Sequence, residues 1–566
     1  MKKIIVFASL LLAITACSFN KSSEKELPIS DQIRINQLGF YPASIKQFLL
    51  VDTFATKFNI IDEEYNIVFS GGLLDNGYWE ASGEKVLMGD FSILTKVGTY
   101  RVIINNEFLS FPFEIKNNLY KEALRASIKS YYFQRASFEI EEQFGGIYRR
   151  PAGHPDNSCK YHPSSGHAKG TLNSVGGWYD AGDYGKYIGN AALSTGQMLL
   201  LAEQYPNLIT DNSLNIPESG NERSDLLDEL KYELDWILSM QDKDGGVYHK
   251  LTAKNFSGFI MPADYDLERW IIGKGTASTL NFSAVMAQAA RIFDKTDSEW
   301  SEKAISASRN AWSWAIENDN IHYVNPKDIK TGEYGDTEFK DDFFWAAAEL
   351  YISTKEEIYL EYLKTNKQDY IHQLTNSWKF FVRNNAFHSL LENKELLDDD
   401  FANYFIKNHI KLANELISEI NVNPYNIALN RYEWGSNSDI LNQALILCIA
   451  HKITGEEKYI DAAEQINDYI FGKNATGYCF LTGFGSKKVM FVHHRPSGAD
   501  GIAEPIPGFI AGGPNNDRQD ADNVSYLSIL PAKSYMDLEA SYASNEVCLN
   551  WNAPAVYVLG YLEENR

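Results

Sequence analysis

The sequence predicts two domains of different class, a small β-sandwich followed by a large all-α domain. Residues 33–115 contain about seven short runs rich in β-branched and aromatic residues, separated by turn signals. From Tyr120 onward, segments of about 12 to 20 residues with helical spacing of apolar positions recur, with almost no strand signal between them. The chain has 566 residues, enough for two or more domains, and its 44% content of hydrophobic residues is typical of a globular protein.

The first 17 residues are predicted to be a targeting segment and not part of the fold. Lys2 and Lys3 precede an apolar run, Ile4–Ile14, which is too short to be a permanent membrane span. Small residues then lead to Cys17, so the segment resembles a bacterial lipoprotein signal, and we expect cleavage before Cys17 and lipidation of it. The alternative is an ordinary secretory signal with an incidental cysteine. Because several acyl chains anchor a protein stably, we expect an outer-membrane lipoprotein of a Gram-negative bacterium, on the periplasmic or cell-surface face.

Residues 18–30 are polar and are predicted to form a short tether, followed by the sandwich at residues 31–117. The expected strands include Gln47–Val51, Phe58–Ile61, Tyr100–Ile104 and Phe108–Phe113. The expected turns lie at Gly71-Gly72, Asp75-Asn76-Gly77 and Asn105-Asn106. About seven short strands in roughly 85 residues suit a sandwich of the immunoglobulin type.

Residues 118–566 are predicted to form the helical domain. The expected helices are Lys121–Arg135, Lys186–Gln204, Asn221–Gln241, Ala277–Phe293, Trp300–Glu317, Phe343–Ser353, Ile371–Val382, Phe405–Ile420, Ser438–Ile453, Tyr459–Phe471 and Pro554–Leu562. A stack of helical hairpins that closes into a ring would place the first and last helices side by side. An open helical solenoid, the alternative, would keep them apart.

Charge and cysteine content limit the partners of the chain. The formal net charge of −23 would repel a phosphate backbone, so nucleic acid is not expected as a partner, whereas an uncharged polysaccharide is compatible. After Cys17, four scattered cysteines remain, and they do not form a disulfide framework; they are Cys159, Cys448, Cys479 and Cys548. We expect mostly buried thiols, although one bridge is permitted outside the cytoplasm. A monomer is expected.

Two separated segments carry carboxylates in a pattern that suits sugar hydrolysis. Asp180 and Asp183 lie among glycines and aromatic residues in GGWYDAGDYGKY at 176–187, and Glu546 is the only charged residue of SYASNEVCLNWN at 541–552. Glycoside hydrolysis needs one carboxylate to activate water and one carboxylic acid to protonate the leaving oxygen. Apolar neighbours of Glu546 would raise its pKa by desolvation. Taken alone, the D-x-x-D pattern is also typical of a helix cap with a turn.

The motifs together resemble glycoside hydrolase family 9, in the subgroup with an immunoglobulin-like domain ahead of an (α/α)6 barrel. The resemblance rests on the two segments above and on GGVYHK at 245–250, DDFFWAAAELY at 341–351, EWGSNSDILNQA at 433–444, LTGFG at 481–485, HHRPSGAD at 493–500 and PGFIAGGPN at 507–515. It implies that Asp183 is the general base, that Asp180 helps to hold the attacking water, and that Glu546 is the general acid.

The activity implied by this resemblance is inverting hydrolysis of internal β-1,4-glucosidic bonds in soluble glucans, such as cellulose-type chains, xyloglucan or mixed-linkage glucan, without a cofactor for catalysis. An exo-acting enzyme on short cello-oligosaccharides or glucosamine-containing chains is the alternative within the same fold. A glycan-binding lipoprotein without activity is a more remote alternative, because all three carboxylates are present.

Substrate-contacting residues follow from the same resemblance. His493 and Arg495 match the family's His-x-Arg, which hydrogen-bonds sugar hydroxyls, and Trp434 and Trp551 match positions for stacking on sugar rings. His249 is expected in the cleft or, as the alternative, in a structural role, and Trp434 could instead belong to the core. Phe491-Val492 departs from the family, which usually has a proline before His493, so the loop shape there is open.

The resemblance also gives expectations for two metal sites, one for zinc and one for calcium. The zinc site of relatives corresponds to Ala136, Gly153, His154 and Ser174, so only one ligand is left and no zinc is expected there. A substitute site at Cys159, His162 and His167 is an alternative. A structural calcium is expected at Asp341 and Asp342, with Asp336 and Glu338 nearby, because hard cations prefer clustered oxygens. The alternative is a solvated acidic helix start.

Overall fold

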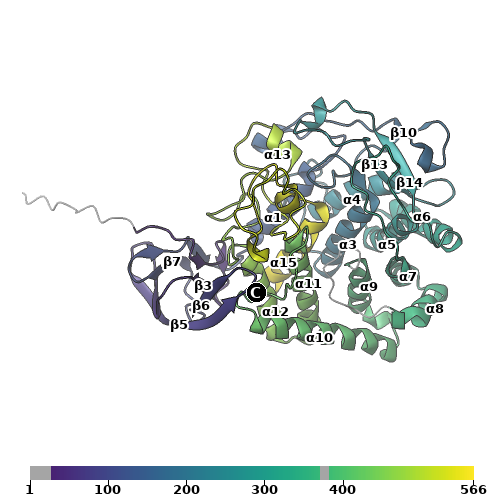
Figure 1. Ribbon diagram of the computed structural model, residues 1–566. Coiled ribbons are helices and arrows are strands. Elements are labelled where there is room, and N and C mark those ends of the chain that lie inside the picture. Colours follow the sequence, from purple (N-terminus) through teal and green to yellow (C-terminus); the bar gives the residue numbers. More distant parts are fainter. Residues whose placement is uncertain (1–26, 370–380) are drawn as a thin grey trace, which may run out of the picture.

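The computed structural model describes residues 27–369 and 381–566. In these ranges the chain forms a β-sandwich and a larger helical domain that lie beside each other (Figure 1). The leader with Cys17, most of the tether and most of the predicted helix Ile371–Val382 lie outside the described residues. Among the described helices, none is both long and apolar enough to span a membrane.

The sandwich is made by the first nine strands. They are β1 (Ile33–Arg34), β2 (Gly39–Phe40), β3 (Gln47–Val51), β4 (Lys57–Ile61), β5 (Ile67–Trp79), β6 (Glu84–Asp90), β7 (Gly98–Ile104), β8 (Phe108–Leu109) and β9 (Phe113–Ile115). Their order is β1-β3-β6-β5-β4-β7-β9-β2, with β8 paired to β7. Aromatic rings fill the space between the layers; Phe48 and Phe58, for example, have ring centroids 4.9 Å apart.

Strand β5 is long because it belongs to both layers of the sandwich. Its first half pairs with β4 and its second half with β6, and the register shifts between Asp75 and Gly77. The turns predicted at Gly71-Gly72 and Asp75-Asn76-Gly77 are therefore wrong: these residues let one strand pass between layers, and the latter group forms an irregularity that a strand can absorb. The predicted turn at Asn105-Asn106 is confirmed, with both residues at positive φ between β7 and β8.

The helical domain contains a ring of six helices. They are α3 (Ile188–Gln204), α5 (Thr276–Phe293), α7 (Lys340–Thr354), α9 (Phe381–Glu392), α11 (Ser436–Thr454) and α15 (Leu549–Asn565). Each contacts the next, and α15 contacts α3. Other helices pack against this ring; they are α1 (Lys121–Phe133), α4 (Asp225–Ser239), α6 (Ser298–Glu317), α8 (Glu357–Asn366), α10 (Asp399–Val422) and α12 (Glu457–Ile470). Short helices α2 (Glu142–Gly145), α13 (Arg495–Ala499) and α14 (Tyr542–Asn545) lie in the connecting segments.

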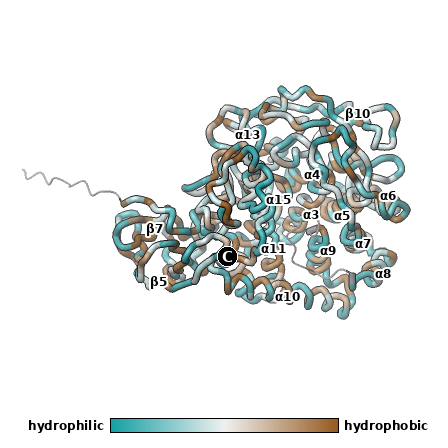
Figure 2. Tube along the Cα trace, viewed as in Figure 1, coloured by the Kyte–Doolittle hydropathy of each residue, from teal (hydrophilic) through white to brown (hydrophobic). Residues whose placement is uncertain are grey.

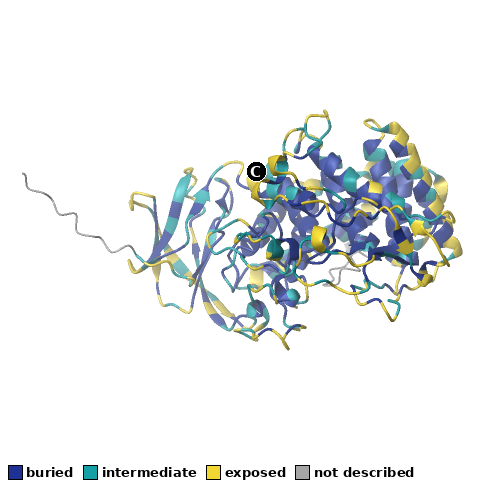
Figure 3. Cartoon of the chain, turned by 90° about the horizontal axis from the view of Figure 1, so that it is seen from above, coloured by how far each residue is buried: buried dark blue, intermediate teal, exposed yellow. Residues whose placement is uncertain are grey.

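Hydropathy distinguishes the ring helices from the outer ones. Nearly every residue of α3 is buried, whereas α10 buries Phe401, Phe405, Leu412 and Leu416 along one face. Apolar and polar residues accordingly alternate along α10 in Figure 2, and Figure 3 shows buried residues concentrated inside the helical domain with exposed ones on its outer helices. A ring helix such as α3 is therefore buried on nearly all sides, whereas an outer helix such as α10 buries one face.

A five-stranded sheet in the helical domain was not expected from the sequence. Its order is β11-β10-β14-β13-β12, formed by β10 (Cys159–Tyr161), β11 (Thr171–Leu172), β12 (Lys186–Tyr187), β13 (Tyr248–Thr252) and β14 (Trp270–Lys274). The prediction of almost no strand after Tyr120 is therefore wrong. Strand β12 of this sheet directly follows the segment that carries Asp180 and Asp183.

The first and last long helices of the helical domain, α1 and α15, lie side by side. The Nδ2 atom of Asn552 on α15 donates to the backbone carbonyl of Ser127 on α1 at 2.9 Å, and the hydroxyl of Tyr131 donates to the carbonyl of Leu549 at 2.8 Å. The expected neighbourhood of the first and last helices is confirmed, which excludes an open solenoid. The four cysteines of the described residues, Cys159, Cys448, Cys479 and Cys548, are buried free thiols, as expected.

Candidate active site

The loop that carries Asp180 and Asp183 is shaped by two glycines and its own hydrogen bonds. Gly176 and Gly177 adopt φ of +89° and +76°, and a Cβ atom on Gly177 would lie 2.5 Å from the ring of Trp236. The backbone N–H of Asp180 donates to the carbonyl of Gly185, and the N–H of Gly185 donates to Oδ2 of Asp183, each at 2.9 Å. The two carboxyl groups are therefore presented from one tight loop ahead of β12 and α3.

Asp180 is held by two donors and is almost inaccessible to solvent. Nδ2 of Asn190 donates to its Oδ1 at 3.0 Å, and the hydroxyl of Tyr334 donates to its Oδ2 at 2.8 Å. Burial raises the pKa of Asp180 to about 7, the charge of Asp183 adds to the rise, and the two hydrogen bonds oppose it. Sequence reasoning missed Tyr334, which lies in a loop without a recognisable motif, and Asn190, which looks like an ordinary helix residue.

Glu546 reaches the same region from the far end of the chain. His493 and Glu546 form an isolated β-bridge, in which the N–H of His493 donates to the carbonyl of Asn545 at 2.9 Å. The N–H of Leu549 donates to the carbonyl of Asp180 at 2.9 Å. Burial raises the pKa of Glu546 well above its ordinary value, Asp183 and Asp180 add to the rise, and Arg495 opposes it. The structure thus brings the three predicted carboxyl groups together.

His493 and Arg495 lie against the loop of the two aspartates. The NH1 atom of Arg495 donates to the carbonyl of Gly182 at 2.7 Å, and its Nε donates to the carbonyl of Ser257 at 3.1 Å. A Cβ atom on Gly182 would lie 2.2 Å from the carbonyl oxygen of His493, so only glycine fits. Nδ1 of His493 is 2.6 Å from the carbonyl of Glu539, and burial lowers the pKa of this histidine to about 4.

Aromatic rings continue from His493 to the predicted stacking position Trp434. The ring of His493 packs against those of Phe259 and Tyr542, and the ring centroid of Trp434 lies 5.4 Å from that of Tyr542. Trp434 is 42% exposed, so its face is available to a ligand. Phe259 and Tyr542 were not singled out from the sequence, because single aromatic residues in loops carry no spacing signal.

The other two predicted contact residues are packed more closely. The ring of Trp551 would meet a Cβ atom on Gly435 at 2.6 Å and on Gly512 at 3.0 Å, so it lies against two glycines. Both ring nitrogens of His249 contact protein atoms, the hydroxyl of Ser278 at 2.6 Å and the carbonyl of Glu333 at 2.8 Å. His249 thus fastens the loop that carries Tyr334.

Comparison with known proteins agrees with this site. Residues 120–559 match the sequence profile of glycosyl hydrolase family 9, and residues 29–107 match that of a cellulase N-terminal ig-like domain. The chain belongs to glycosyl hydrolase family 9. The resemblance seen in the motifs is thereby confirmed, and so is the immunoglobulin-like sandwich ahead of a helical catalytic domain.

Several members of glycosyl hydrolase family 9 are similar to the chain over almost all of its length. A xyloglucan-specific endo-beta-1,4-glucanase of Bacteroides ovatus is 38% identical over 94% of this chain and 94% of its own length. Endoglucanase D of Acetivibrio thermocellus is 32% identical over 94% of this chain and 84% of its own length. Among solved structures, a family 9 protein of Bacteroides ovatus has a TM-score of 0.87 at 36% identity, covering 94% of this chain and 99% of that one.

The calcium site expected at Asp341 and Asp342 has some of the features that a cation requires, but not all of them. Asp341 and Asp342 are buried at the start of α7, and Oδ2 of Asp342 has no hydrogen-bond partner among the described residues, which suits a cation. Within residues 27–369 and 381–566, however, no group of three or more His, Cys, Asp or Glu could hold a metal ion. Calcium would need further oxygens from backbone or water.

The substitute zinc site is not assembled in the described residues. Sγ of Cys159 lies 3.5 Å from Asp156, Nε2 of His162 lies 3.3 Å from Asp328, and Nε2 of His167 lies 2.9 Å from Asp242. The three side chains therefore have three different partners. At the position of the relatives' zinc site, Nδ1 of His154 contacts the hydroxyl of Tyr179 at 2.7 Å instead.

Proposed function

We propose that this family 9 protein is an inverting endo-β-1,4-glucanase acting on soluble glucans, with xyloglucan as the preferred class. One observation carries the proposal: the hydrogen bond from Leu549 to Asp180 and the bridge between His493 and Glu546 join three distant segments around one group of carboxyls. The xyloglucan-specific relative supports the choice of substrate, at 38% identity over nearly the whole chain.

In the proposed reaction, Asp183 and Glu546, which lie far apart in the sequence, carry out opposite proton transfers. Asp183 accepts a proton from water while the water oxygen bonds to the anomeric carbon. The bond from that carbon to the glycosidic oxygen breaks, and Glu546 gives its proton to the departing oxygen. Burial raises the pKa of Glu546 and so favours the protonated form that a general acid needs. Asp180, fixed by Tyr334 and Asn190, holds the water against the base, and exchange with solvent restores both groups.

A small cavity lies beside the proposed base, Asp183. It is lined by Thr252, Phe256, Tyr265 and Thr331 among others and has a volume of about 10 Å³. This volume is close to the least that one water molecule requires. The lining of this cavity includes Asp183 but neither Asp180 nor Glu546.

The activity is tested by the anomer and the length of the products. Proton NMR recorded early in hydrolysis of xyloglucan and of lichenan should show the α-anomer first, since inversion of a β-linkage produces it. Sizing of products from a reducing-end-labelled oligosaccharide should show early mid-chain cuts. Early release of the β-anomer would contradict the roles given to Asp183 and Glu546. A ladder of monomer or dimer would instead support the exo-acting alternative.

We also propose that the helical domain is an (α/α)6 barrel. The closed ring of six helices and the six outer helices that pack against it support this arrangement. Trp434, His493 and Arg495 are proposed to line the glucan-binding cleft. A crystal structure with a bound oligosaccharide tests both proposals, because the sugar should lie over the end of the ring that presents Glu546.

The proposed location is the outer membrane, through a lipid on Cys17, on the periplasmic or cell-surface face. The basic residues, the short apolar run and the small residues before Cys17 support it. Radiolabelled palmitate should be incorporated into the wild-type chain in a Gram-negative host. In contrast, the Cys17→Ser variant should carry no label and should leave the membrane fraction.

A further inference from the structure

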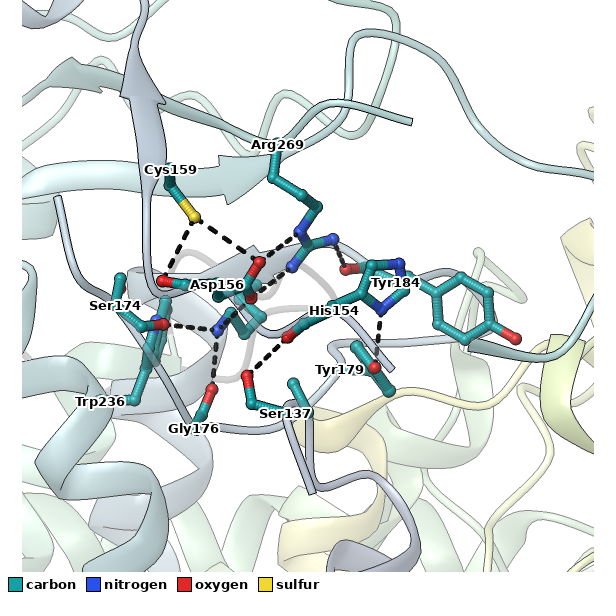
Figure 4. A network of polar contacts seen from close by, with 12 residues as sticks. Ser137, His154, Asp156, Cys159, Ser174, Gly176, Tyr179, Tyr184, Trp236 and Arg269 are labelled. Atoms are coloured by element: carbon teal, nitrogen blue, oxygen red, sulfur yellow. Dashed lines mark hydrogen bonds and ion pairs between the residues drawn. The ribbon is translucent and has the colours of Figure 1, made fainter. Parts of the chain in front are cut away.

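A buried carboxylate, Asp156, lies between two buried cations close to the loop of the aspartates (Figure 4). Its Oδ2 atom is 2.8 Å from Nζ of Lys186, and its Oδ1 atom is 3.1 Å from Nε of Arg269. The NH2 group of Arg269 also donates to Oδ2 at 3.2 Å. All three residues are nearly inaccessible to solvent. None of them was singled out from the sequence.

The two cations are attached to both ends of the segment that carries Asp180 and Asp183. Nζ of Lys186 donates to the backbone carbonyl of Ser174 at 3.1 Å and to that of Gly176 at 2.7 Å, both before the segment. NH1 of Arg269 donates to the carbonyl of Tyr184, directly after it. Asp156 therefore connects the two ends of the segment through two charged side chains.

The network has a high electrostatic cost. Removing three charges from water is expensive, and a buried ion pair is often no more stabilising than apolar residues of the same volume. Burial alone would raise the pKa of Asp156, but the charges and hydrogen bonds of Arg269 and Lys186 lower it to about 2. The ion pairs thus offset the cost of burial, and the contacts of Lys186 and Arg269 with backbone carbonyls give the network a second role, which is to fix one loop conformation.

We propose that Asp156 is a positioning residue, which together with Lys186 and Arg269 fixes the conformation of the loop that presents Asp180 and Asp183. This inference rests on the proposed hydrolase function, because the loop matters through its two carboxyl groups. A misplacement of about 1 Å can reduce an enzymatic rate by roughly 100-fold. Asp156 does not touch the reacting atoms and acts through the two cations.

The test compares Asp156→Asn with a matched variant, Glu349→Gln. Glu349 is a fully buried carboxylate of α7 whose Oε2 lies 2.6 Å from NH1 of Arg291, and it makes no contact with the site described above. Both changes neutralise a buried, arginine-paired carboxylate with little change of volume. We expect Asp156→Asn to reduce kcat on xyloglucan by roughly 10- to 100-fold with KM within about twofold, whereas Glu349→Gln should retain kcat at temperatures where it is folded.

A second measurement does not depend on activity. Hydrogen exchange followed by mass spectrometry should show faster exchange in the peptide covering residues 176–187 of Asp156→Asn, and no such change in Glu349→Gln. Wild-type kcat in Asp156→Asn, or unchanged exchange of that peptide, would overturn the proposal. An inactive wild-type protein would refute the hydrolase function instead, and the exchange measurement would still decide whether Asp156 orders the loop.

Discussion

Asp180 and Asp183 are buried and Glu546 is half-buried in one region, where desolvation and nearby like charges favour the neutral forms of Asp180 and Glu546. The pKa shifts of these two groups differ. Glu546 has a strongly raised pKa, while the pKa of Asp180 is raised to about 7 despite donors from Tyr334 and Asn190. A carboxyl group whose pKa is strongly raised, close to a second carboxyl group that can act as base, is the pair that an inverting glycoside hydrolase requires.

Replacing Glu546 by Gln should remove the proton donor while keeping the shape of the site. We expect kcat on xyloglucan to fall by ~100-fold or more, because the sugar oxygen would leave without protonation. Binding of an oligosaccharide, measured by calorimetry, should survive. The measurement is initial-rate kinetics on the intact polysaccharide.

An aryl cello-oligosaccharide with a dinitrophenolate leaving group provides the control for Glu546→Gln. Such a leaving group needs little protonation, so its hydrolysis should be reduced much less than that of xyloglucan. Equal losses on both substrates would indicate a general disturbance of the site and would contradict the role of Glu546 as acid.

Asp180 is predicted to make the stability of the protein depend on pH. Because its folded pKa of about 7 lies above its ordinary value of 3.8, the stability that it contributes is complete below about pH 4 and is lost as pH rises through 7. The Asp180→Asn variant does not titrate there. It should therefore be more stable than wild type at pH 8, by on the order of 1 kcal/mol or more, with the difference shrinking towards pH 4.

Thermal unfolding of Asp180→Asn and wild type from pH 4 to pH 8 measures this difference. The pH dependence of the difference reports the titration of Asp180 together with the change that its charge causes in the pKa of Glu546. A constant difference over the whole range would show that Asp180 keeps an ordinary pKa in the folded protein.

At the scale of the elements, regular spacing was predictable and irregular pairing was not. Most predicted helices are present, and α10 begins at Asp399, earlier than the predicted Phe405, because the side chain of Asp398 accepts from the N–H of Phe401 at 2.9 Å as an N-cap. Helix α8 was missed, and so was nearly all of α9, which begins at Phe381, where the predicted helix Ile371–Val382 ends. The sheet of β10 to β14 was also missed, because its short strands are scattered between residues 159 and 274 and are separated by helices and long loops.

Helix α7 is where a structural calcium is proposed. Two buried aspartates, Asp341 and Asp342, begin this helix, and one oxygen of Asp342 has no partner in the described part of the chain. A bound Ca²⁺ would be coordinated by carboxylate oxygens of these two aspartates and by further oxygens from backbone and water. We expect the melting temperature of protein treated with EDTA to rise by several degrees on adding CaCl2.

The Asp342→Asn variant is the control for this calcium effect. It should lose the response to CaCl2, because the partnerless oxygen is part of the proposed site. Magnesium chloride at equal ionic strength accounts for screening. If wild type and Asp342→Asn respond alike, the acidic start of α7 is not a calcium site.

At the scale of the whole molecule, the sandwich is attached to the helical domain through a buried charged group. Glu84 at the start of β6 accepts a hydrogen bond from the hydroxyl of Tyr425 at 2.5 Å, and Nζ of Lys533 lies 2.7 Å from its Oε1. Trp79 at the end of β5 packs on Tyr425 with ring centroids 4.3 Å apart. This interface had no signal in the sequence, because its parts are single residues far apart in the chain.

Lys533 links the interface to the acid-bearing segment. It ends a short turn, Pro531–Lys533, after which the hydroxyl of Tyr535 donates to Oδ1 of Asn545 at 2.5 Å, next to Glu546. The closure of the ring, by contrast, could be predicted from the sequence, because motifs at both ends of the helical domain pointed to one site. Through Lys533 and Tyr535, the sandwich is thus connected to the segment that carries Glu546.

Replacing Glu84 by Gln should weaken both the attachment of the sandwich and the support of this segment. Gln keeps the hydrogen bond from Tyr425 but leaves the charge of Lys533 without its buried partner, which should cost roughly 1–3 kcal/mol of stability. Because Lys533 lies close to the acid-bearing segment, we also expect kcat on xyloglucan to fall about two- to tenfold. The exposed Asp75→Asn change, which removes only a surface ion pair with Lys85, should leave the stability and kcat within error of wild type. Calorimetry and initial rates of both variants test this prediction. If Glu84→Gln has the same stability and kcat as Asp75→Asn, this interface does not contribute to the activity of the helical domain.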